Sequence, residues 1–250
     1  MAIQRTLYTV GTITVSGVPL FAQSISHSHS RPRESISALG RSNVQRTASG
    51  PETAQVEVTF YVTGGEHVLL QALMTDAARQ SPTRVAVQST MGSLSQALMT
   101  SLKGDASIGS VPTVSASFNG INDVTTITTA TSAAAITEIL TTESVSVNGS
   151  GCSQKASFSW DMPVEPIMCL GNSIATGAEW FGNPPGSASI SVEGTTDPGR
   201  ATKVDIGNFS FSLSSSSDID STTKNLAVGQ LFGTFNTVTS DIAINCSVST

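Results

Sequence analysis

The most regular pattern in this sequence is a two-residue alternation of apolar and polar positions. Over residues 55–62, Val56, Val58, Phe60 and Val62 share one parity. Successive side chains of a strand point to opposite faces, so this segment predicts a strand with one buried face. Weaker alternation predicts further strands in the first half at residues 8–15, 22–30, 83–88 and 113–118.

Two segments depart from this alternation. Over residues 66–79 the apolar side chains recur at helical spacing, which predicts a helix. In the second half, residues 194–207 include the turn-forming sequence Asp-Pro-Gly and predict a loop in place of that helix. Strands are predicted after this loop at residues 209–213 and 241–246.

The chain also repeats part of itself at an offset of 131 residues. The ungapped motif Q-x-x-S-x-S-x-x-x-P-x-E-x-I-x-x-L-G-x-S begins at Gln23 and again at Gln154. This period is longer than the ~20–50 residues of a solenoid repeat and has the length of a domain. We therefore predict two related domains, residues 1–130 and 131–250, with a boundary near residues 129–138.

Composition supports a mainly β fold and a covered surface. Serine, threonine, valine and glycine are abundant, and they favour strands and turns. Charged residues make up 12% of the chain, about half the usual share. A chain so poor in charge is expected to cover much of its surface with partners.

The net charge of −6 is unevenly distributed. Residues 1–125 carry eight Lys/Arg against seven Asp/Glu (+1), and residues 126–250 carry four against eleven (−7). The two halves are therefore expected to attract each other between neighbouring subunits. A sequence-specific DNA-binding protein would need clustered cations to neutralise phosphates, which this balance argues against.

The residues that could carry catalysis or bind a metal are sparse. His27, His29 and His67 are the only histidines, and no nucleophile elbow, P-loop or dinucleotide-binding motif is present. The three cysteines fit neither a disulfide framework nor a zinc site. We expect no enzyme activity and no cofactor. His27 and His29 share a strand face, but no third metal ligand is evident nearby.

The two segments that follow the repeated strand differ in charge. The first carries four arginines with Glu34 as their acidic neighbour, and the second, residues 162–185, carries Glu165 and Glu179 and no Lys or Arg. They are either solvated loops or interface arms in which arginines of one copy meet carboxylates of the other. The candidate interface residues are Arg31, Arg33, Glu34, Leu39, Arg41, Arg46, Glu165, Leu170 and Glu179.

Two segments resemble the tail tube proteins of long-tailed bacteriophages. One is the strand, Pro-Arg-Glu-Ser-Ile excursion and return strand of residues 22–62, echoed at residues 153–192. The other is residues 107–120, which are similar to the strand that closes that family's domain. Together they cover about half of the chain.

The resemblance implies two tandem β-sandwich or barrel domains that stack into a tube. In that family, six domains form a ring around a channel for the genome. Two domains per chain then imply three chains per ring with pseudo-sixfold symmetry. The expected partners are further copies of the chain, other tail proteins (tape measure, terminator, distal tail) and DNA passing through the lumen. The expected location is the virion tail, assembled in the host cytoplasm, with no membrane span.

Two other functions remain open at this stage. Terminator, distal tail and head–tail joining proteins share the same domain design. A Ser/Thr-rich adhesion or carbohydrate-binding module is a different class, and it would need exposed aromatic rings to stack on sugars. Beyond the phenylalanines, Tyr8, Tyr61, Trp160 and Trp180 are the aromatic residues available for that purpose.

Overall fold

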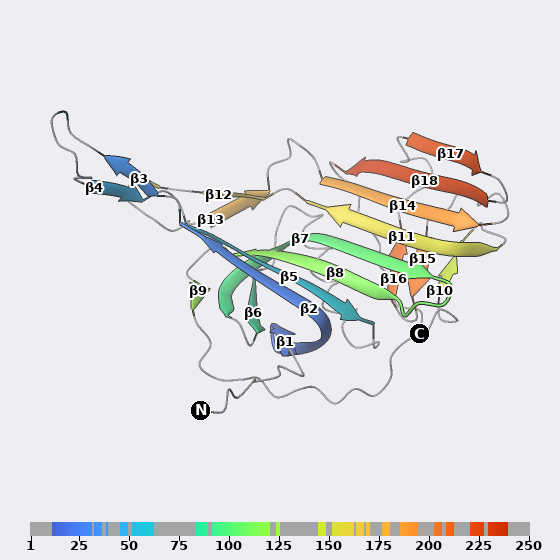
Figure 1. Cartoon of the computed structure of the whole chain (residues 1–250), viewed down its shortest axis with the longest axis horizontal. Coiled ribbons are helices and arrows are strands. Elements are labelled where there is room, and N and C mark those ends of the chain that lie inside the picture. The colour runs from blue at the N-terminus through green and yellow to red at the C-terminus, as the bar shows by residue number, and fades with distance from the viewer. Residues whose placement is uncertain are drawn as a thin grey trace, which may run out of the picture.

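A computed structural model describes the architecture as mainly β (Figure 1). The described residues are 12–31, 33–36, 39, 46–49, 52–62, 84–89, 92–120, 124–125, 145–148, 152–162, 164–167, 169–170, 177–180, 186–194, 203–206, 209–212, 221–227 and 230–239. Within these ranges the regular structure consists of strands, and no helix occurs.

Six strands of the first half close into a barrel. Their order is β7-β6-β1-β2-β5-β8, and a β7–β8 pairing joins the two ends. The bounds are β1 Thr12–Val15, β2 Val18–Ser30, β5 Thr53–Tyr61, β6 Val85–Ser89, β7 Ser93–Ser107 and β8 Thr113–Gly120. Closure leaves no free edge around the barrel, which removes a site of unwanted strand pairing.

Strand β7 joins this barrel to a second sheet. One edge of β7 pairs with β8, while the other pairs first with β6 and then, over residues 101–107, with β11. From β11 the sheet continues to β14, β18 and β17, giving eleven strands with the short β9 included. The bounds are β9 Val124–Thr125, β11 Ser153–Asp161, β14 Gly186–Gly194, β17 Ser221–Ala227 and β18 Gln230–Thr239.

A separate three-stranded sheet packs on the inner face of this extension. Its order is β10-β15-β16, with bounds Val145–Val147, Lys203–Ile206 and Phe209–Ser212. Phe158 of β11 stacks on Phe211 of β16 with ring centroids 4.5 Å apart. Val204 and Ile206 are also buried in this contact, so the second half is a sandwich of two layers.

One continuous core runs through the barrel and the sandwich. The alternating residues Val56, Val58 and Phe60 of β5 are buried, as the sequence pattern predicts. Trp160 of β11 is the largest of the fully buried side chains. Gly104 of β7 lies opposite Phe158, and a side chain at this position would overlap the Phe158 ring.

The strand predictions agree closely with the structure in the first half. Four segments coincide with β2, β5, β6 and β8, and the part of residues 8–15 that is described forms β1. In the second half, β16 confirms the strand predicted at residues 209–213. The predicted helix at residues 66–79, the domain boundary at 129–138 and the strand at 241–246 lie outside the described residues.

Two details of the prediction are wrong. Residues 194–207 do not form only a loop, because Lys203–Ile206 is strand β15 and covers part of the core. The longest strand, β7, was not predicted. Its alternation fails at Ala97, Leu98 and Met99, which are all buried, and the β7–β8 register shifts between Met99 and Ser101.

Candidate assembly surfaces

Two β-hairpin arms project from the same end of the β body (Figure 1). The first joins β2 to β5 and contains β3 (Arg33–Ile36) and β4 (Arg46–Ser49). Arg31 and Arg33 are exposed at its base. Leu39, between the two strands, has a relative exposure of 107%. An apolar side chain held fully in water is a candidate contact residue.

The second arm joins β11 to β14 and contains β12 (Val164–Ile167) and β13 (Gly177–Trp180). Leu170 has a relative exposure of 106%, and Ile167 of 38%. Glu165 and Glu179 are register partners across the two strands.

The two arms match at the offset found in the sequence. Adding 131 to the bounds of β3 and β4 gives the bounds of β12 and β13. The register also matches, since Arg33 pairs with Ser49 and Val164 pairs with Trp180. The exposed Leu39 and Leu170 are related by the same offset.

The candidate interface residues therefore fall on these two arms. Glu34 and Arg46 lie on β3 and β4, opposite Ala48 and Ile36 respectively. Arg41 lies outside the described residues. Glu165 and Glu179 are backbone register partners on the second arm, whereas Leu39 and Leu170 lie on separate arms.

A broad hydroxyl-rich face covers the outer side of the sheet from β5 through β8, β7 and β11 to β14. Two cross-strand hydroxyl pairs lie on it, Thr59 with Ser115 at 2.9 Å and Ser159 with Ser189 at 2.7 Å. Its other described polar members are Gln55, Glu57, Thr113, Ser117, Asn119, Ser101, Lys103, Asp105, Ser107, Lys155, Ser157, Asp161, Ser187, Ser191 and Glu193.

The two lysines of this hydroxyl-rich face are both neutralised by neighbouring carboxylates. Lys103 Nζ lies 3.6 Å from Asp161, and Lys155 Nζ lies 3.3 Å from Asp105. Because Glu57 and Glu193 add two further carboxylates, the described part of the face carries a net charge of −2 (two lysines against four acids). Such a surface offers hydroxyl groups and few attractive sites for phosphate.

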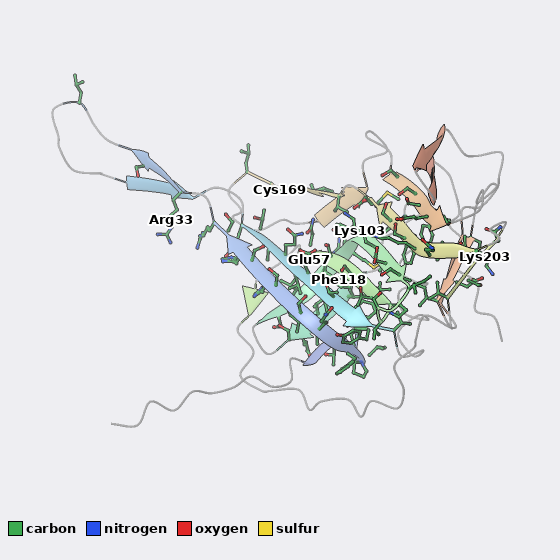
Figure 2. All side chains as sticks on the ribbon, turned by 45° about the vertical axis from the view of Figure 1, so that its right-hand side comes forward. Arg33, Glu57, Lys103, Phe118, Cys169 and Lys203 are labelled. Atoms are coloured by element: carbon green, nitrogen blue, oxygen red, sulfur yellow. The ribbon has the colours of Figure 1, made fainter. Side chains whose placement is uncertain are left out.

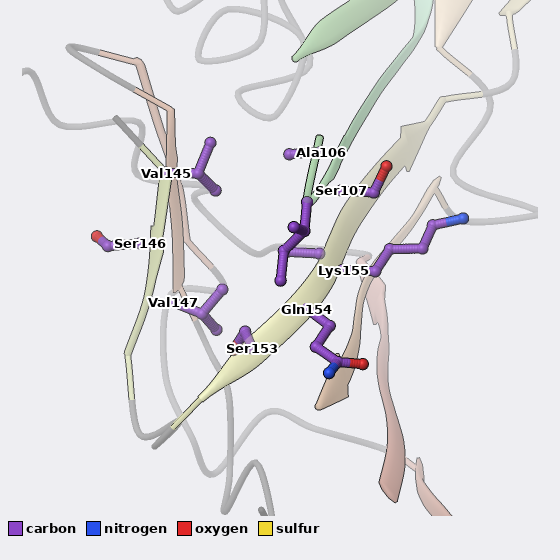
Figure 3. A pocket seen from close by; sticks show the side chains of 10 residues that line it. Ala106, Ser107, Val145, Ser146, Val147, Ser153, Gln154 and Lys155 are labelled. Atoms are coloured by element: carbon purple, nitrogen blue, oxygen red, sulfur yellow. The ribbon is translucent and has the colours of Figure 1, made fainter. Parts of the chain in front are cut away.

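The end of the body opposite the arms carries a second apolar feature. Ile108 and Val111, in the turn between β7 and β8, are exposed to 69% and 43%. Beside Ile108 lies a hollow of about 70 Å³ between β10 and β11. Figure 3 shows Val145 and Val147 pointing toward Ala106 across this hollow, while Ser146 points away.

Sequence reasoning missed this opposite end as a candidate site. The sequence signal for this end was the pair Ile108 and Val111, which lie in a turn that contains Gly109 at φ 80°. Apolar side chains that are exposed in a turn are not needed for folding. The hollow itself depends on pairing β10 with β15 and β7 with β11, which are contacts between distant segments.

The two described histidines, His27 and His29, have different neighbours. His29 Nε2 contacts Glu52 at 2.5 Å, whereas the imidazole of His27 packs directly on Gly92. Burial, with a smaller contribution from His29, lowers the pKa of His27 below 6.5. Across the described ranges there is no group of three or more His, Cys, Asp or Glu side chains placed to hold a metal ion.

Comparisons with known proteins gave no assignment. No protein-family model matches the chain, and no curated protein matches it. In the part of the chain that the structure describes, no helix has the length and apolar character needed to span a bilayer.

Proposed function

We propose that this chain is a self-assembling structural subunit, the major tail tube protein of a long-tailed bacteriophage. The observation that carries the proposal is the pair of matching arms, which project from one end of a β body and hold leucines fully in water. Two matching arms that each expose a leucine at the same position of the repeat favour contact with partners. In this proposal the protein is part of the virion tail, with other tail proteins as partners.

We infer that the two halves descend from one duplicated domain. Beyond the arms, each half pairs the strand before its arm with the strand after it, β2 with β5 and β11 with β14. The buried series Ala54-Val56-Val58 reappears as Ala188-Ile190-Val192, now at an offset of 134. Ala54 follows Ser49 by five residues and Ala188 follows Trp180 by eight, which accounts for the change from 131 to 134.

Duplication suggests how a ring is built. Three chains would place six similar bodies around an axis, with first and second halves alternating. The first arm is basic, with four arginines and one glutamate over residues 31–50, and the second, residues 162–185, carries Glu165 and Glu179 and no Lys or Arg. Alternation then sets a basic arm beside an acidic arm at each junction, which complementary charge favours.

We propose further that the hydroxyl-rich face lines the channel. DNA binding grows with every phosphate that a protein neutralises, so a conduit must avoid unpaired cations. The lysines of this face are paired with Asp161 and Asp105, and the remaining acids make it net negative. DNA would therefore slide past it without being held.

A carbohydrate-binding module is less well supported. Trp160 is buried with 0% exposure. The ring of the half-buried Tyr61 packs against the ring of Phe21, with centroids 5.6 Å apart. Neither Trp160 nor Tyr61 is therefore free to stack on a sugar. Trp180 lies on β13 of the second arm, and Tyr8 lies outside the described residues.

Negative-stain electron microscopy of the purified chain over a range of concentrations tests the proposal. Hollow tubes or stacked rings are the expected result. A single closed ring that never stacks would instead identify a terminator or joining protein. A monomer at every concentration, even with added tail-tip extract as initiator, would rule the tube function out.

A further inference from the structure

His27 is a titratable side chain enclosed at the end of the barrel that carries the first arm. Its register partner on β5 is Val56, which is 0% exposed, so the imidazole lies on the inward face of the barrel. The ring also covers Gly92 in the β6–β7 turn, where a Cβ would lie 2.6 Å from Cε1 of His27. The imidazole therefore joins β2 to this turn.

The Nε2 atom of His27 is buried and has no hydrogen-bond partner in the described part of the chain. A neutral imidazole can leave this nitrogen unprotonated, as an acceptor without a donor. An imidazolium carries a proton on both ring nitrogens, so Nε2 would become a buried donor without an acceptor, which is costly. Burial accordingly lowers the pKa of His27, and the neighbouring His29 lowers it further.

The described charged groups around His27 provide no counterion for an imidazolium. His29 follows on the same face of β2, and Arg31 comes just beyond the end of that strand. The carboxylate of Glu52 contacts Nε2 of His29. The facing residues of β5 and of the described part of the β6–β7 turn carry no titratable group: Ala54, Val56, Val58, Ser89 and Gly92.

The turn that His27 covers is held by a buried serine. Ser89 is 1% exposed, and its hydroxyl donates to the carbonyl oxygen of Gly92 at 3.0 Å. The backbone N–H of Ser89 donates to the same oxygen, also at 3.0 Å. A carbonyl oxygen has two lone pairs, so this one is already satisfied and is not available to an imidazolium. The turn cannot accept a proton from His27 without rearranging.

The end of β2 that carries His27 is paired along one edge among the described strands. β1 pairs with residues 18–21 and β5 with residues 22–30. Figure 2 shows Arg33 just past this end, where the first arm leaves the body. His27 therefore holds the root of the first arm from the side that no described strand covers.

The second copy has an apolar ring in place of this imidazole. Phe158 follows His27 by 131 residues and occupies the same register position, opposite Ile190 as His27 is opposite Val56. Unlike the end of β2, β11 is paired along both edges, with β14 and with β7. An apolar ring therefore fits this position of the fold, and the root of the second arm has no titratable group there.

We propose that protonation of His27 separates the end of β2 from the β6–β7 turn and frees the root of the first arm, while the root of the second arm stays fixed. The open state exposes Nε2 to water and so binds the proton more tightly than the closed state. Acidification shifts the equilibrium toward the state that binds the proton more tightly. This response belongs to the single chain and does not depend on the proposed function.

Hydrogen–deuterium exchange of the whole, unassembled chain, followed by mass spectrometry, tests this release. Measurements at about pH 8 and about pH 5 span the range in which histidine titrates. After correction for the intrinsic effect of pH on exchange, peptides covering residues 24–31 and 88–95 should exchange several-fold faster at the lower pH. Peptides covering residues 153–161 should exchange at the same corrected rate at both.

Substitutions identify the group that takes up the proton. His27→Phe and His27→Leu keep an apolar side chain that cannot be protonated, so both should abolish the acid response of the two segments. His29→Gln is the matched control, because it leaves Nε2 of His27 buried, and it should keep most of the response. In NMR spectra of the parent, the His27 imidazole signal should titrate with the same midpoint as the exchange.

Four results would overturn the inference. One is equal corrected exchange of residues 24–31 and 88–95 at both pH values in the parent. Another is an undiminished acid response in His27→Phe and His27→Leu. The third is an equal rise at residues 153–161, which would indicate a loss of global stability rather than release of one arm. The fourth is an exchange midpoint that follows the imidazole signal of His29 instead of that of His27.

Discussion

At the scale of single residues, Gly104 is required by close packing. A side chain here would overlap Phe158, which is itself stacked on Phe211 across the two layers. Gly104→Ala is therefore expected to lower the free energy of unfolding by about 1–3 kcal/mol, the usual range for an overpacked core. Urea denaturation followed by circular dichroism measures this change.

Gly17 provides the matched control for Gly104→Ala. It has a positive φ of 82° in the β1–β2 turn, and no atom lies within 4 Å of the position that a Cβ would take. Asparagine tolerates this left-handed conformation better than most residues, so Gly17→Asn adds backbone strain but no overlap and should lower stability less than Gly104→Ala does. Equal losses in the two variants would contradict the packing argument.

His27 makes the free energy of unfolding depend on pH, and the environment of its side chain sets the sign of that dependence. Burial, and to a lesser extent His29, lowers the pKa of His27 below 6.5. On acidification, His27 of the unfolded chain is protonated before His27 of the folded chain. The free energy of unfolding therefore has its full value above pH 6.5 and decreases below it. The loss levels off below the lowered pKa of the folded state.

His27→Phe removes this proton and places the ring type of Phe158, the residue 131 positions later, at this site. The free energy of unfolding of the variant should decrease less on acidification than that of the parent. His29→Gln is the control, and it should retain most of the parent's decrease. Parallel pH profiles for the parent and His27→Phe would contradict the assignment.

At the scale of elements, the two-residue periodicity of the sequence is sufficient to predict a strand that has one buried face. The alternating burial of β5 and β8 follows directly from their sequences. β7 was missed because it serves both the barrel and the extended sheet. Ala97, Leu98 and Met99 are all buried at the point where its partners change, so its two-residue period is interrupted.

The candidate sites were predictable to different degrees for the same reason. The arms follow from a local repeat, and the candidate residues Leu39 and Leu170 are exposed on them. The hollow beside Ile108 and the hydroxyl-rich face are formed by residues far apart in the chain. Their location depends on which strands pair, which alternation alone does not determine.

The first arm can be removed without touching the body. Ser30 and Thr53 are register partners, so an Asn-Gly turn joining them closes an ordinary two-residue hairpin. The shortened chain is expected to keep a cooperative thermal transition and its β spectrum, because the deleted residues lie outside the described core. It should fail to form tubes in electron micrographs.

The complementary variant joins Asp161 to Ser187 by the same turn and removes the second arm together with Met162, which packs partly buried against the core. If the arms alternate around a ring, mixing the two shortened chains should not restore tubes, because every junction between the two halves of one chain would still lack one arm. Normal tubes from either shortened chain alone would show that the arms do not carry assembly.

At the scale of the whole molecule, the charge distribution predicts a low affinity for DNA. Assembled wild-type protein should not retain duplex DNA at physiological salt. Ser115→Lys with Ser159→Lys adds two cations to the hydroxyl-rich face and should raise DNA retention by about tenfold or more, with a steep salt dependence. Cosedimentation measures it, and Ser115→Asn with Ser159→Asn is the neutral control. Equal retention by both double variants would place this face outside the channel.

The central claim is that two related halves of one chain alternate around a ring of three chains. Class averages of end-on tubes by cryo-electron microscopy test it most directly, because they count chains per layer. The account predicts threefold symmetry with six similar lobes of density around an open channel. Layers of six chains with true sixfold symmetry, or lobes that do not alternate, would contradict it.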